Sequence, residues 1–323
     1  MMRLSYSLGS LLTVNQILHC AKKLNQVKPD VIWIPETWGM ENFSMLSASS
    51  SVNNFSKIGS SIINIYSRSP TQIAMGAATV DTISNGRLIL GLGTSSKPII
   101  ENFHGTKFVN PLQRMREYVE IIRLCMSGEK INYTGQLFSL ENFSLLIQPP
   151  RENIPIYLAA VNQKMVELTW EIGDGVIFYL RPKNEIKATL DKMQKQRKID
   201  STLQIITCVD ENSEKAIERT KKTVAFYVSV GEIYRNFLAN NGYKNEVENI
   251  YGEYITSGLQ SNFTLVTDKM INDLCICGTP DEALYQLNAF QDTGIDLPII
   301  QFNPIDEVEA SFDLLIDTFG DIN

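Results

Sequence analysis

The chain has 323 residues, of which 44% are hydrophobic, and its formal net charge of −7 gives a pI near 5.1. This acidic balance argues against a nucleic-acid or anionic-membrane surface, because either would need a stripe of basic residues. No apolar run approaches the roughly 18 residues that a membrane span needs, and residues 1–10 lack the apolar core of a secretion signal. We therefore expect a soluble, cytoplasmic protein with no nucleic-acid or membrane partner.

The cysteines and histidines narrow the chemistry further. The five cysteines form no paired framework, which suits a reducing compartment. Cys275 and Cys277 are separated by a single residue, so they are not a C-x-x-C redox pair. The two histidines, His19 and His104, lie far apart in the sequence, and we expect no metal site.

Extended apolar segments alternate with helical patterns along the chain. The eight candidate strands cover residues 3–8, 30–35, 57–65, 87–93, 154–159, 175–180, 202–209 and 297–302. The helical patterns cover residues 14–25, 44–53, 71–83, 112–127, 163–172, 183–197, 213–230, 281–293 and 306–319. Strand–helix units of this number close into a (β/α)8 TIM barrel, because right-handed crossovers permit few alternatives. We expect one α/β barrel domain over residues 1–323.

Two insertions interrupt this repeat. Residues 129–150 contain Tyr133-Thr134-Gly135 between extended residues, which predicts a hairpin. Residues 231–273 are longer and carry aromatic residues at irregular spacing. Because long excursions in compact domains are commonly lids or binding loops, we expect a substrate cover there, with a subunit contact as the alternative.

Residues 58–93 hold the most specific pattern of the chain. An apolar run with embedded polar residues is followed by Arg68-Ser69-Pro70, a helical segment, Asn85-Gly86 and a second apolar run that ends in Gly91-Leu92-Gly93. Proline suits the first turn of a helix and Asn-Gly suits its end, so we expect two parallel strands joined by a helix. The polar residues fall near the carboxyl ends of the strands, where α/β proteins bind their ligands.

The sequence contains no nucleotide-binding fingerprint. Gly91-Leu92-Gly93 supplies only part of a G-x-G-x-x-G motif, because Ser96 stands where the third glycine would be, and a Walker loop is absent. A Rossmann-type dinucleotide site is therefore not supported.

These motifs resemble those of the bacterial-luciferase-like flavin and deazaflavin oxidoreductases. The family pattern of R-x-P, A-T-L-D with S-x-G-R, and G-L-G is matched by Arg68-Ser69-Pro70, Ala78-Thr79-Val80-Asp81, Ser84-Asn85-Gly86-Arg87 and Gly91-Leu92-Gly93. The likeness continues over residues 111–140, 155–178 and 276–302. The resemblance implies an oxidoreductase with the barrel fold that acts on a small-molecule substrate. It leaves the oligomeric state open between a monomer and a homodimer.

The resemblance also implies where a cofactor would bind. In this family the ring rests at the mouth of the barrel against a bulge in the third strand, often a non-proline cis peptide, which the alignment places at Ser61-Ile62. The polar loop after the fourth strand would bind the ring edge, and the helix N-terminus at residues 160–163 would bind a phosphate. The implied cofactor-binding residues are Ser61, Ile62, Asn64, Thr94, Ser95, Ser96, Ala160, Val161, Asn162 and Gln163.

Glu36-Thr37-Trp38, after the second strand, takes the place of an Asp-His-aromatic pattern found in deazaflavin-dependent relatives. The resemblance therefore makes these three residues the catalytic candidates. Glu36 would be a proton donor if burial favours its neutral form, and Thr37 a hydrogen-bonding group. Trp38 would form a wall stacked over a ligand or a loop.

Three functions remain open. The first is a coenzyme F-420 (deazaflavin) dependent oxidoreductase, similar to methylenetetrahydromethanopterin reductases, that transfers hydride to or from a small organic acceptor by positioning alone. Asn64-Ile65-Tyr66 before Arg68 resembles the NPY-x-R-x-P motif of those reductases and favours this assignment. The alternative is an FMN-dependent monooxygenase, for which His104 is the only plausible histidine near the flavin. The third is a non-catalytic barrel that has lost cofactor binding.

Overall fold

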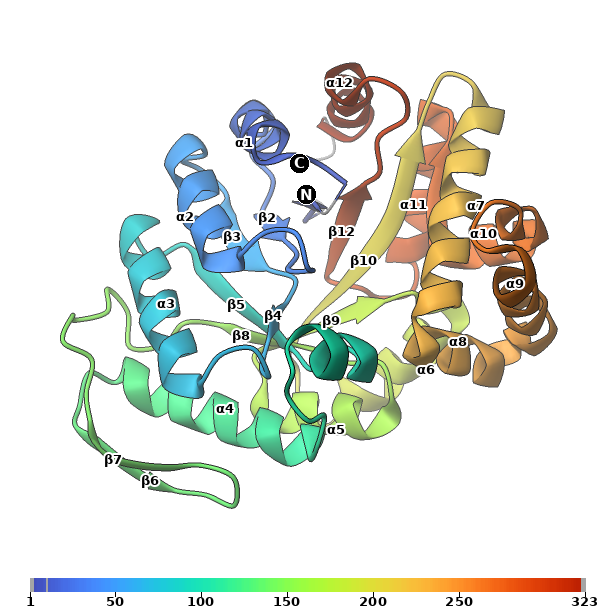
Figure 1. Ribbon diagram of the computed structural model, residues 1–323. Coiled ribbons are helices and arrows are strands. Elements are labelled where there is room, and N and C mark those ends of the chain that lie inside the picture. Colours follow the sequence, from blue (N-terminus) through green and yellow to red (C-terminus); the bar gives the residue numbers. More distant parts are fainter. Residues whose placement is uncertain (1–2, 10, 321–323) are drawn as a thin grey trace.

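The structure is a computed structural model that describes residues 3–9 and 11–320. Its parallel strands form a closed barrel, and the helices surround it in chain order (Figure 1). The barrel strands are β1 (Ser5–Ser7), β2 (Val31–Ile34), β3 (Lys57–Ser60), β4 (Ile63–Asn64), β5 (Leu88–Gly93), β8 (Ile156–Ala159), β9 (Gly175–Tyr179), β10 (Asp200–Val209) and β12 (Leu297–Phe302). The ring closes because β12 pairs with β1 and β9 pairs with β10. The predicted (β/α)8 barrel is confirmed, while the predicted domain limits at 1 and 323 lie outside the described residues.

The described helices include those that the sequence predicts, with similar bounds, and further helices within residues 231–274. They are α1 (Val14–Lys23), α2 (Asn42–Val52), α3 (Pro70–Ile83), α4 (Pro111–Met126), α5 (Gln163–Ile172), α6 (Lys183–Met193), α7 (Ser213–Val230), α8 (Glu232–Leu238), α9 (Lys244–Ser257), α10 (Asp268–Leu274), α11 (Pro280–Gln291) and α12 (Val308–Phe319), with the short turns η1 (Ile99–Phe103), η2 (Ala239–Tyr243) and η3 (Asn262–Leu265). Capping boxes at Thr13 and Thr279 fix the starts of α1 and α11. Over the described part of the chain, no helix combines the length and apolar character that crossing a bilayer requires.

Large aromatic side chains fill the barrel interior below its mouth. The rings of Trp33 and Tyr157 lie 5.9 Å apart, between centroids, inside an apolar cluster. Glycines on neighbouring strands make this possible, because a Cβ on Gly59 would lie 2.4 Å from the Trp33 ring and one on Gly175 would lie 2.8 Å from Tyr157. The amino end of the barrel is therefore packed core, and a ligand must bind at the carboxyl end of the strands.

The third barrel strand is interrupted between β3 and β4. The peptide bond between Ser61 and Ile62 is cis, which confirms the geometry that the family resemblance implied. Just before the break, the Ser60 hydroxyl donates to the carbonyl oxygen of Gly91 at 2.9 Å and accepts from its N–H at 2.8 Å. A Cβ on Gly91 would lie 1.8 Å from the Ser60 carbonyl oxygen, so only glycine permits this close approach.

The predicted hairpin within residues 129–150 is confirmed. Strands β6 (Ile131–Thr134) and β7 (Ser139–Phe143) pair antiparallel and project beyond α4, at the lower left of Figure 1. The buried Glu117 carboxylate of α4 anchors the hairpin, because it accepts hydrogen bonds from the backbone N–H groups of Gln136, Leu137 and Phe138.

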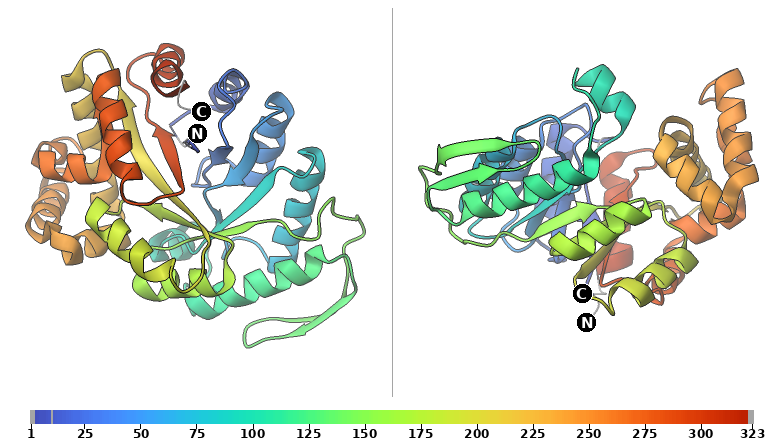
Figure 2. Two further views of the ribbon diagram at one scale, coloured as in Figure 1. Left: turned by 180° about the vertical axis from the view of Figure 1, so that it is seen from behind. Right: turned by 90° about the horizontal axis from the view of Figure 1, so that it is seen from below.

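Residues 231–273 form elements that the sequence analysis did not assign, and their suggested role as a substrate cover or a subunit contact stays a prediction. The segment is mostly helical, with α8, α9 and α10, and it leads into an additional strand, β11 (Cys275–Gly278), that the sequence analysis missed. Among the described strands, β11 pairs with the carboxyl-terminal part of β10 alone, beyond the residues of β10 that pair with β9. Side chains such as Leu238, Val247 and Ile250 pack with α7 in a core of their own. Figure 2 (right) shows η1 (teal) and this helical segment (orange) extending from the same end of the barrel, on either side.

Candidate functional site

Four segments proposed as a site from the sequence meet at the carboxyl-terminal mouth of the barrel. They are residues 36–38 after β2, 61–64 at the break between β3 and β4, 94–96 after β5 and 160–163 after β8. The strand register places them side by side, because Ile34 pairs with Ser60, Asn64 pairs with Gly93 and Leu92 pairs with Leu158. The structure therefore brings the predicted site residues to one rim, although more than 120 residues separate the first from the last.

Ile62 forms the apolar floor of this rim. A Cβ on Gly93 would lie 2.5 Å from Ile62 Cδ1 and 3.4 Å from Ala159 Cβ, so the Ile62 side chain rests directly on the glycine backbone. Ile62 is half-buried and packs on the aromatic cluster of the barrel interior. Beside it, the buried Ser61 hydroxyl finds no hydrogen-bond partner among the described residues. A buried hydroxyl without a partner carries a cost in free energy, so this oxygen is well suited to a bound polar group.

The loop after β5 adds hydroxyl groups at the rim. Thr94, Ser95 and Ser96 are all half-buried. Ser95 has a φ of +57°, an uncommon value for a residue with a side chain, and it turns the chain from β5 toward η1. The Thr94 hydroxyl faces the carbonyl oxygen of Ser95 at 3.4 Å, at the outer limit of hydrogen bonding, and so is weakly held.

The N-terminus of α5 completes this side of the mouth. Asn162 is the N-cap residue, and its Oδ1 accepts a hydrogen bond from the N–H of Met165 at 3.1 Å. Asn162 and Gln163 are exposed, and the positive end of the helix dipole at the start of α5 favours an anion there. The buried Arg181 steadies this segment, because its Nη2 donates to the carbonyl oxygen of Val161 at 2.5 Å. The preceding Ala160 is buried.

Glu36 forms an ion pair that the sequence did not predict. Both its oxygens accept from the Arg68 guanidinium, at 2.6 and 2.9 Å, and they also accept from the backbone N–H groups of Asn42 and Asn64. Arg68 further binds Glu41 at 2.6 Å, and its hydrogen bonds to Glu36 raise the pKa of the guanidinium despite partial burial. These contacts tie the loop after β2 to β4 and α2. They support a positioning role for Glu36, and its suggested role as a proton donor stays a prediction.

The other predicted residues near Glu36 differ in their surroundings. Thr37 is half-buried, whereas the Trp38 side chain is 62% exposed and meets the exposed Phe103 of η1 edge to face at 5.6 Å. Trp38 thus contacts η1, and its suggested role as a wall over a ligand or a loop stays a prediction. Asn64 is buried, and its Oδ1 accepts from the N–H of Tyr66, which shapes the turn after β4. His104 is exposed at the end of η1.

The sequence analysis missed a polar wall on the other side of the mouth. Tyr179 of β9, Gln204 of β10 and Gln301 of β12 lie on the inner face of the barrel and are half-buried. Two features of the sequence could have predicted this wall. Side chains alternate between the two faces of a strand, so Tyr179 shares a face with Gly175 and Ile177. Gln204 and Gln301 each interrupt an apolar run. The position of these polar residues near strand ends could have identified them.

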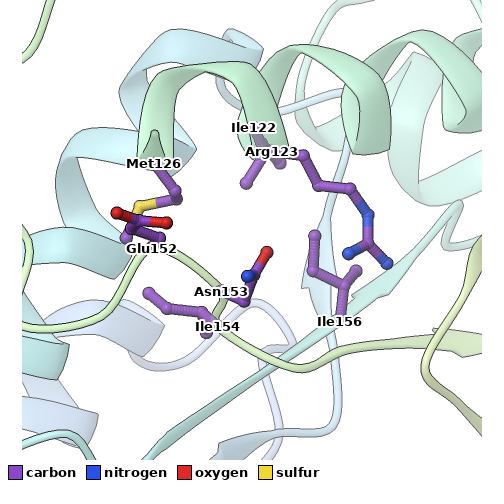
Figure 3. Close-up of a pocket in the computed structure, with 7 residues that line it drawn as sticks. All are labelled: Ile122, Arg123, Met126, Glu152, Asn153, Ile154 and Ile156. Carbon is purple, nitrogen blue, oxygen red and sulfur yellow. The ribbon is translucent and has the colours of Figure 1, made fainter. Parts of the chain in front are cut away.

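Two hollows away from the mouth do not suit a cofactor. The hollow in Figure 3 lies between α4 and the start of β8, at the amino end of the strands, and its volume is about 10 Å³, room for a single water. A shallow hollow of about 320 Å³ between α4 and α5 is lined by outward-facing residues such as Arg116 and Glu171. Across residues 3–9 and 11–320, no three His, Cys, Asp or Glu side chains are grouped to hold a metal ion.

Comparison with known proteins decides the family. The family model described as luciferase-like monooxygenase matches residues 3–297. The chain belongs to this family. It is 31% identical over 281 residues to the 5,10-methylenetetrahydromethanopterin reductase of Archaeoglobus fulgidus, covering 82% of this chain and 83% of that protein. It is 27% identical to a putative coenzyme F-420-dependent oxidoreductase of Mycobacterium tuberculosis, covering 86% and 88% of the two chains. This luciferase-like protein is therefore an oxidoreductase.

Solved structures share its fold. The coenzyme F-420 dependent tetrahydromethanopterin reductase of Methanopyrus kandleri has a TM-score of 0.86 at 22% identity, covering 97% of each chain. An F-420-dependent secondary alcohol dehydrogenase, solved with an F-420–acetone adduct, has a TM-score of 0.80 at 18% identity, covering 100% of this chain and 98% of that one. At these identities the likeness establishes the barrel architecture of this family member.

Proposed function

We propose that this protein is a coenzyme F-420 (deazaflavin) dependent oxidoreductase that transfers hydride between the deazaflavin and a small organic acceptor, as the methylenetetrahydromethanopterin reductases that it resembles do. The observation that carries the proposal is the arrangement at the break between β3 and β4. There, the apolar Ile62 side chain rests on Gly93 beside the unpartnered Ser61 hydroxyl. An apolar floor with a polar atom at its edge fits one face and the polar rim of a flat tricyclic ring.

The residues around this floor have distinct roles in the proposal. Ile62 would support the face of the ring, while Ser61 and the hydroxyls of the 94–96 loop would bind its polar edge. The N–H groups at the start of α5 would hold the phosphate of the cofactor side chain. The bound deazaflavin would supply the hydride chemistry, which needs positioning rather than acid–base assistance from the protein.

The Glu36–Arg68 pair supports a positioning mechanism. Because the Glu36 oxygens are occupied by the guanidinium and two backbone N–H groups, the pair fixes the loop that carries Thr37 and Trp38 at the rim. Thr37 would offer a hydrogen bond to the acceptor, and the exposed Trp38 would limit the access of water from one side.

Cofactor titration tests the proposal. Purified protein is titrated with coenzyme F-420 and, separately, with FMN while quenching of cofactor fluorescence is recorded. We expect saturable quenching of the deazaflavin and none of FMN. Oxidised deazaflavin on the protein should then lose its absorbance when a reduced pterin transfers hydride to it, and reduced deazaflavin should regain its absorbance when an oxidised pterin takes that hydride.

The opposite outcomes would contradict the proposal in different ways. Saturable binding of FMN without binding of the deazaflavin would identify a flavin monooxygenase instead. Failure of both cofactors to bind would identify a barrel that has lost its redox function. A Ser61→Ala variant, expected to weaken deazaflavin binding about 3- to 10-fold through loss of one hydrogen bond, ties the measurement to this site.

A further inference from the structure

A tyrosine of α4 holds the backbone of the residue whose side chain forms the ion pair at the mouth. The Tyr118 hydroxyl donates to the carbonyl oxygen of Arg68 at 2.5 Å, and Tyr118 is only 1% exposed. Arg68 precedes Ser69, the N-cap residue of α3, so this carbonyl oxygen lies outside the hydrogen-bond ladder of that helix. The Arg68 guanidinium meanwhile binds Glu36 and Glu41. Arg68 is therefore fixed from two sides, at its carbonyl oxygen by a phenol and at its guanidinium by two carboxylates.

The surroundings of Tyr118 fix its hydroxyl and keep it protonated. Arg114, one turn earlier on α4, lies with its guanidinium 4.6 Å from the centre of the Tyr66 ring and 5.3 Å from the centre of the Phe138 ring. Burial raises the pKa of Tyr118, although the nearby charge of Arg114 opposes the rise. The phenol therefore keeps its proton and is the donor in the hydrogen bond to Arg68.

The tip of the hairpin β6–β7 contacts the same turn of α4. Glu117 accepts from the backbone N–H groups of residues 136–138, at 2.9 to 3.0 Å, and the Tyr118 ring meets the Phe138 ring edge to face at 5.3 Å. Consecutive residues of a helix point about 100° apart, so Glu117 binds the hairpin while Tyr118 also reaches Arg68. The hairpin that projects beyond α4 in Figure 1 is thereby joined to the mouth through two successive residues.

The hydrogen bonds that Glu36 makes to the backbone are sensitive to the position of Arg68. Glu36 accepts from the N–H of Asn42 at 3.2 Å and from the N–H of Asn64 at 3.4 Å. Both bonds are long, so a small displacement of the Glu36 carboxylate would break them. Because the Arg68 guanidinium holds that carboxylate, a shift of Arg68 would release the loop after β2 and the turn after β4 together.

We infer that Tyr118 is a positioning residue for the cofactor site. By holding the carbonyl oxygen of Arg68, it keeps the guanidinium on Glu36 and so keeps residues 36–38 at the rim beside residues 61–64. The hairpin tip supports this role through its contact with the Tyr118 ring. The part of the inference that concerns the cofactor rests on the proposed function, whereas the part that concerns the loop does not.

Amide hydrogen exchange of the cofactor-free protein tests the inference. Fragments that cover residues 36–44 and 61–68 are followed by mass spectrometry in the wild type and in Tyr118→Phe, which removes one oxygen and keeps the ring. We expect the N–H groups of Asn42 and Asn64 to exchange about 3- to 10-fold faster in the variant, because one hydrogen bond that holds Arg68 is lost. The dissociation constant of coenzyme F-420, measured by fluorescence quenching, should rise about 3- to 10-fold as well.

The matched control is Tyr133→Phe. The Tyr133 hydroxyl also joins the hairpin to α4, because it donates to Glu120 Oε2 at 2.7 Å. Its acceptor is charged, so we expect the control to lower the Tm at least as much as Tyr118→Phe does. Exchange of residues 36–44 and 61–68 and the dissociation constant of coenzyme F-420 should nevertheless stay within about twofold of wild type in the control. The melts also verify that both variants are folded.

Three outcomes would overturn the inference. They are exchange of residues 36–44 and 61–68 in Tyr118→Phe at the wild-type rate, equally accelerated exchange of these residues in Tyr133→Phe, and accelerated exchange in Tyr118→Phe with the affinity for coenzyme F-420 unchanged. If the wild type binds no coenzyme F-420, the proposed function has failed, and the exchange rates alone decide whether Tyr118 positions the loop that carries Glu36.

Discussion

At the scale of single residues, ion pairs between side chains fix the loops at the mouth of the barrel. Arg68 contacts Glu36 and Glu41 through one guanidinium, and its planar group also lies 5.5 Å from the centre of the Phe43 ring. Only a guanidinium can bind two carboxylates in this forked manner, since the ammonium of lysine is a point charge. The loop that carries the catalytic candidates therefore depends on one residue of the R-x-P motif.

Arg68→Lys should loosen this loop. We expect a loss of about 1–3 kcal/mol in the free energy of unfolding, because buried carboxylate oxygens lose their hydrogen bonds, together with weaker deazaflavin binding. Urea unfolding and the fluorescence titration measure the two effects. The control is Arg116→Lys, which alters an exposed forked pair with Glu171 and should change stability by less than about 0.5 kcal/mol. Equal effects in both variants would contradict the special role of Arg68.

The N-cap residue of α5 allows the phosphate assignment to be separated from stability. Asn162→Ala removes the cap and should cost about 1 kcal/mol. Asn162→Asp keeps an oxygen for the Met165 N–H and should leave stability close to wild type, but its charge should repel a phosphate at the helix start and weaken deazaflavin binding about tenfold. If Asn162→Asp binds the deazaflavin as tightly as wild type does, the phosphate lies elsewhere.

At the scale of elements, the hairpin β6–β7 depends on a carboxylate from a different element. Burial by itself would raise the pKa of Glu117, but hydrogen bonds from Gln113 and from the backbone of residues 136–138 outweigh it and hold the pKa below its usual value. The charged form is therefore favoured in the folded protein. Stability from this group is present in full above the pKa of the unfolded chain, and it is lost as the pH falls through the lower, folded-state pKa.

Glu117→Gln should reveal this dependence on pH. At pH 7 we expect the variant to unfold with about 1–3 kcal/mol less free energy than wild type, since buried N–H groups lose a charged acceptor. The difference between the two proteins should begin to shrink as the pH falls below the ordinary glutamate pKa of about 4.3, and it should vanish once the pH has fallen through the lower pKa of the folded wild type, where its carboxyl is protonated. Urea unfolding at several pH values measures it. Glu129→Gln, at an exposed site, is the control, and a difference for Glu117→Gln that does not vary with pH would refute the assignment.

The helices and strands show which elements local sequence determines. The bounds of α5 and α7 match the prediction, because caps at Asn162 and Asn212 mark their starts and an amphipathic pattern follows each cap. β11 was missed because its four residues, Cys-Ile-Cys-Gly, are too few to show a period. The helices of residues 231–273 were missed because their aromatic side chains do not recur at helical spacing in the sequence. They pack in one cluster with residues of α7.

At the scale of the whole molecule, contacts that stabilise the fold lie at the amino end of the barrel, and the candidate site lies at the carboxyl end. At the amino end, Arg3 donates to both oxygens of Asp200 at 2.8 and 3.0 Å, and the Tyr157 hydroxyl donates to the same carboxylate. The bond to Asp200 is the chief reason that the pKa of Arg3 is raised. These contacts link β1, β8 and β10 across the closed ring, opposite the proposed cofactor site.

Asp200→Asn should therefore lower stability without affecting the site. We expect a loss of about 1–3 kcal/mol, visible as a lower Tm, while deazaflavin affinity stays within about twofold of wild type. Asp306→Asn, which removes a surface pair with Lys215, serves as the control and should scarcely change the Tm. A large loss of affinity in folded Asp200→Asn would show that the two ends are coupled.

The sequence by itself indicated the strand–helix repeat of the barrel and the hairpin, because each unit shows a pattern within a few tens of residues. The resemblance to a family indicated the four segments that form one rim of the mouth. Only the tertiary structure decided that Glu36 is paired with Arg68, that Ser61 lacks a partner, and that Tyr118 holds the carbonyl oxygen of Arg68. Such contacts join residues from different strand–helix units, and their geometry is fixed by the closure of the ring rather than by any local pattern.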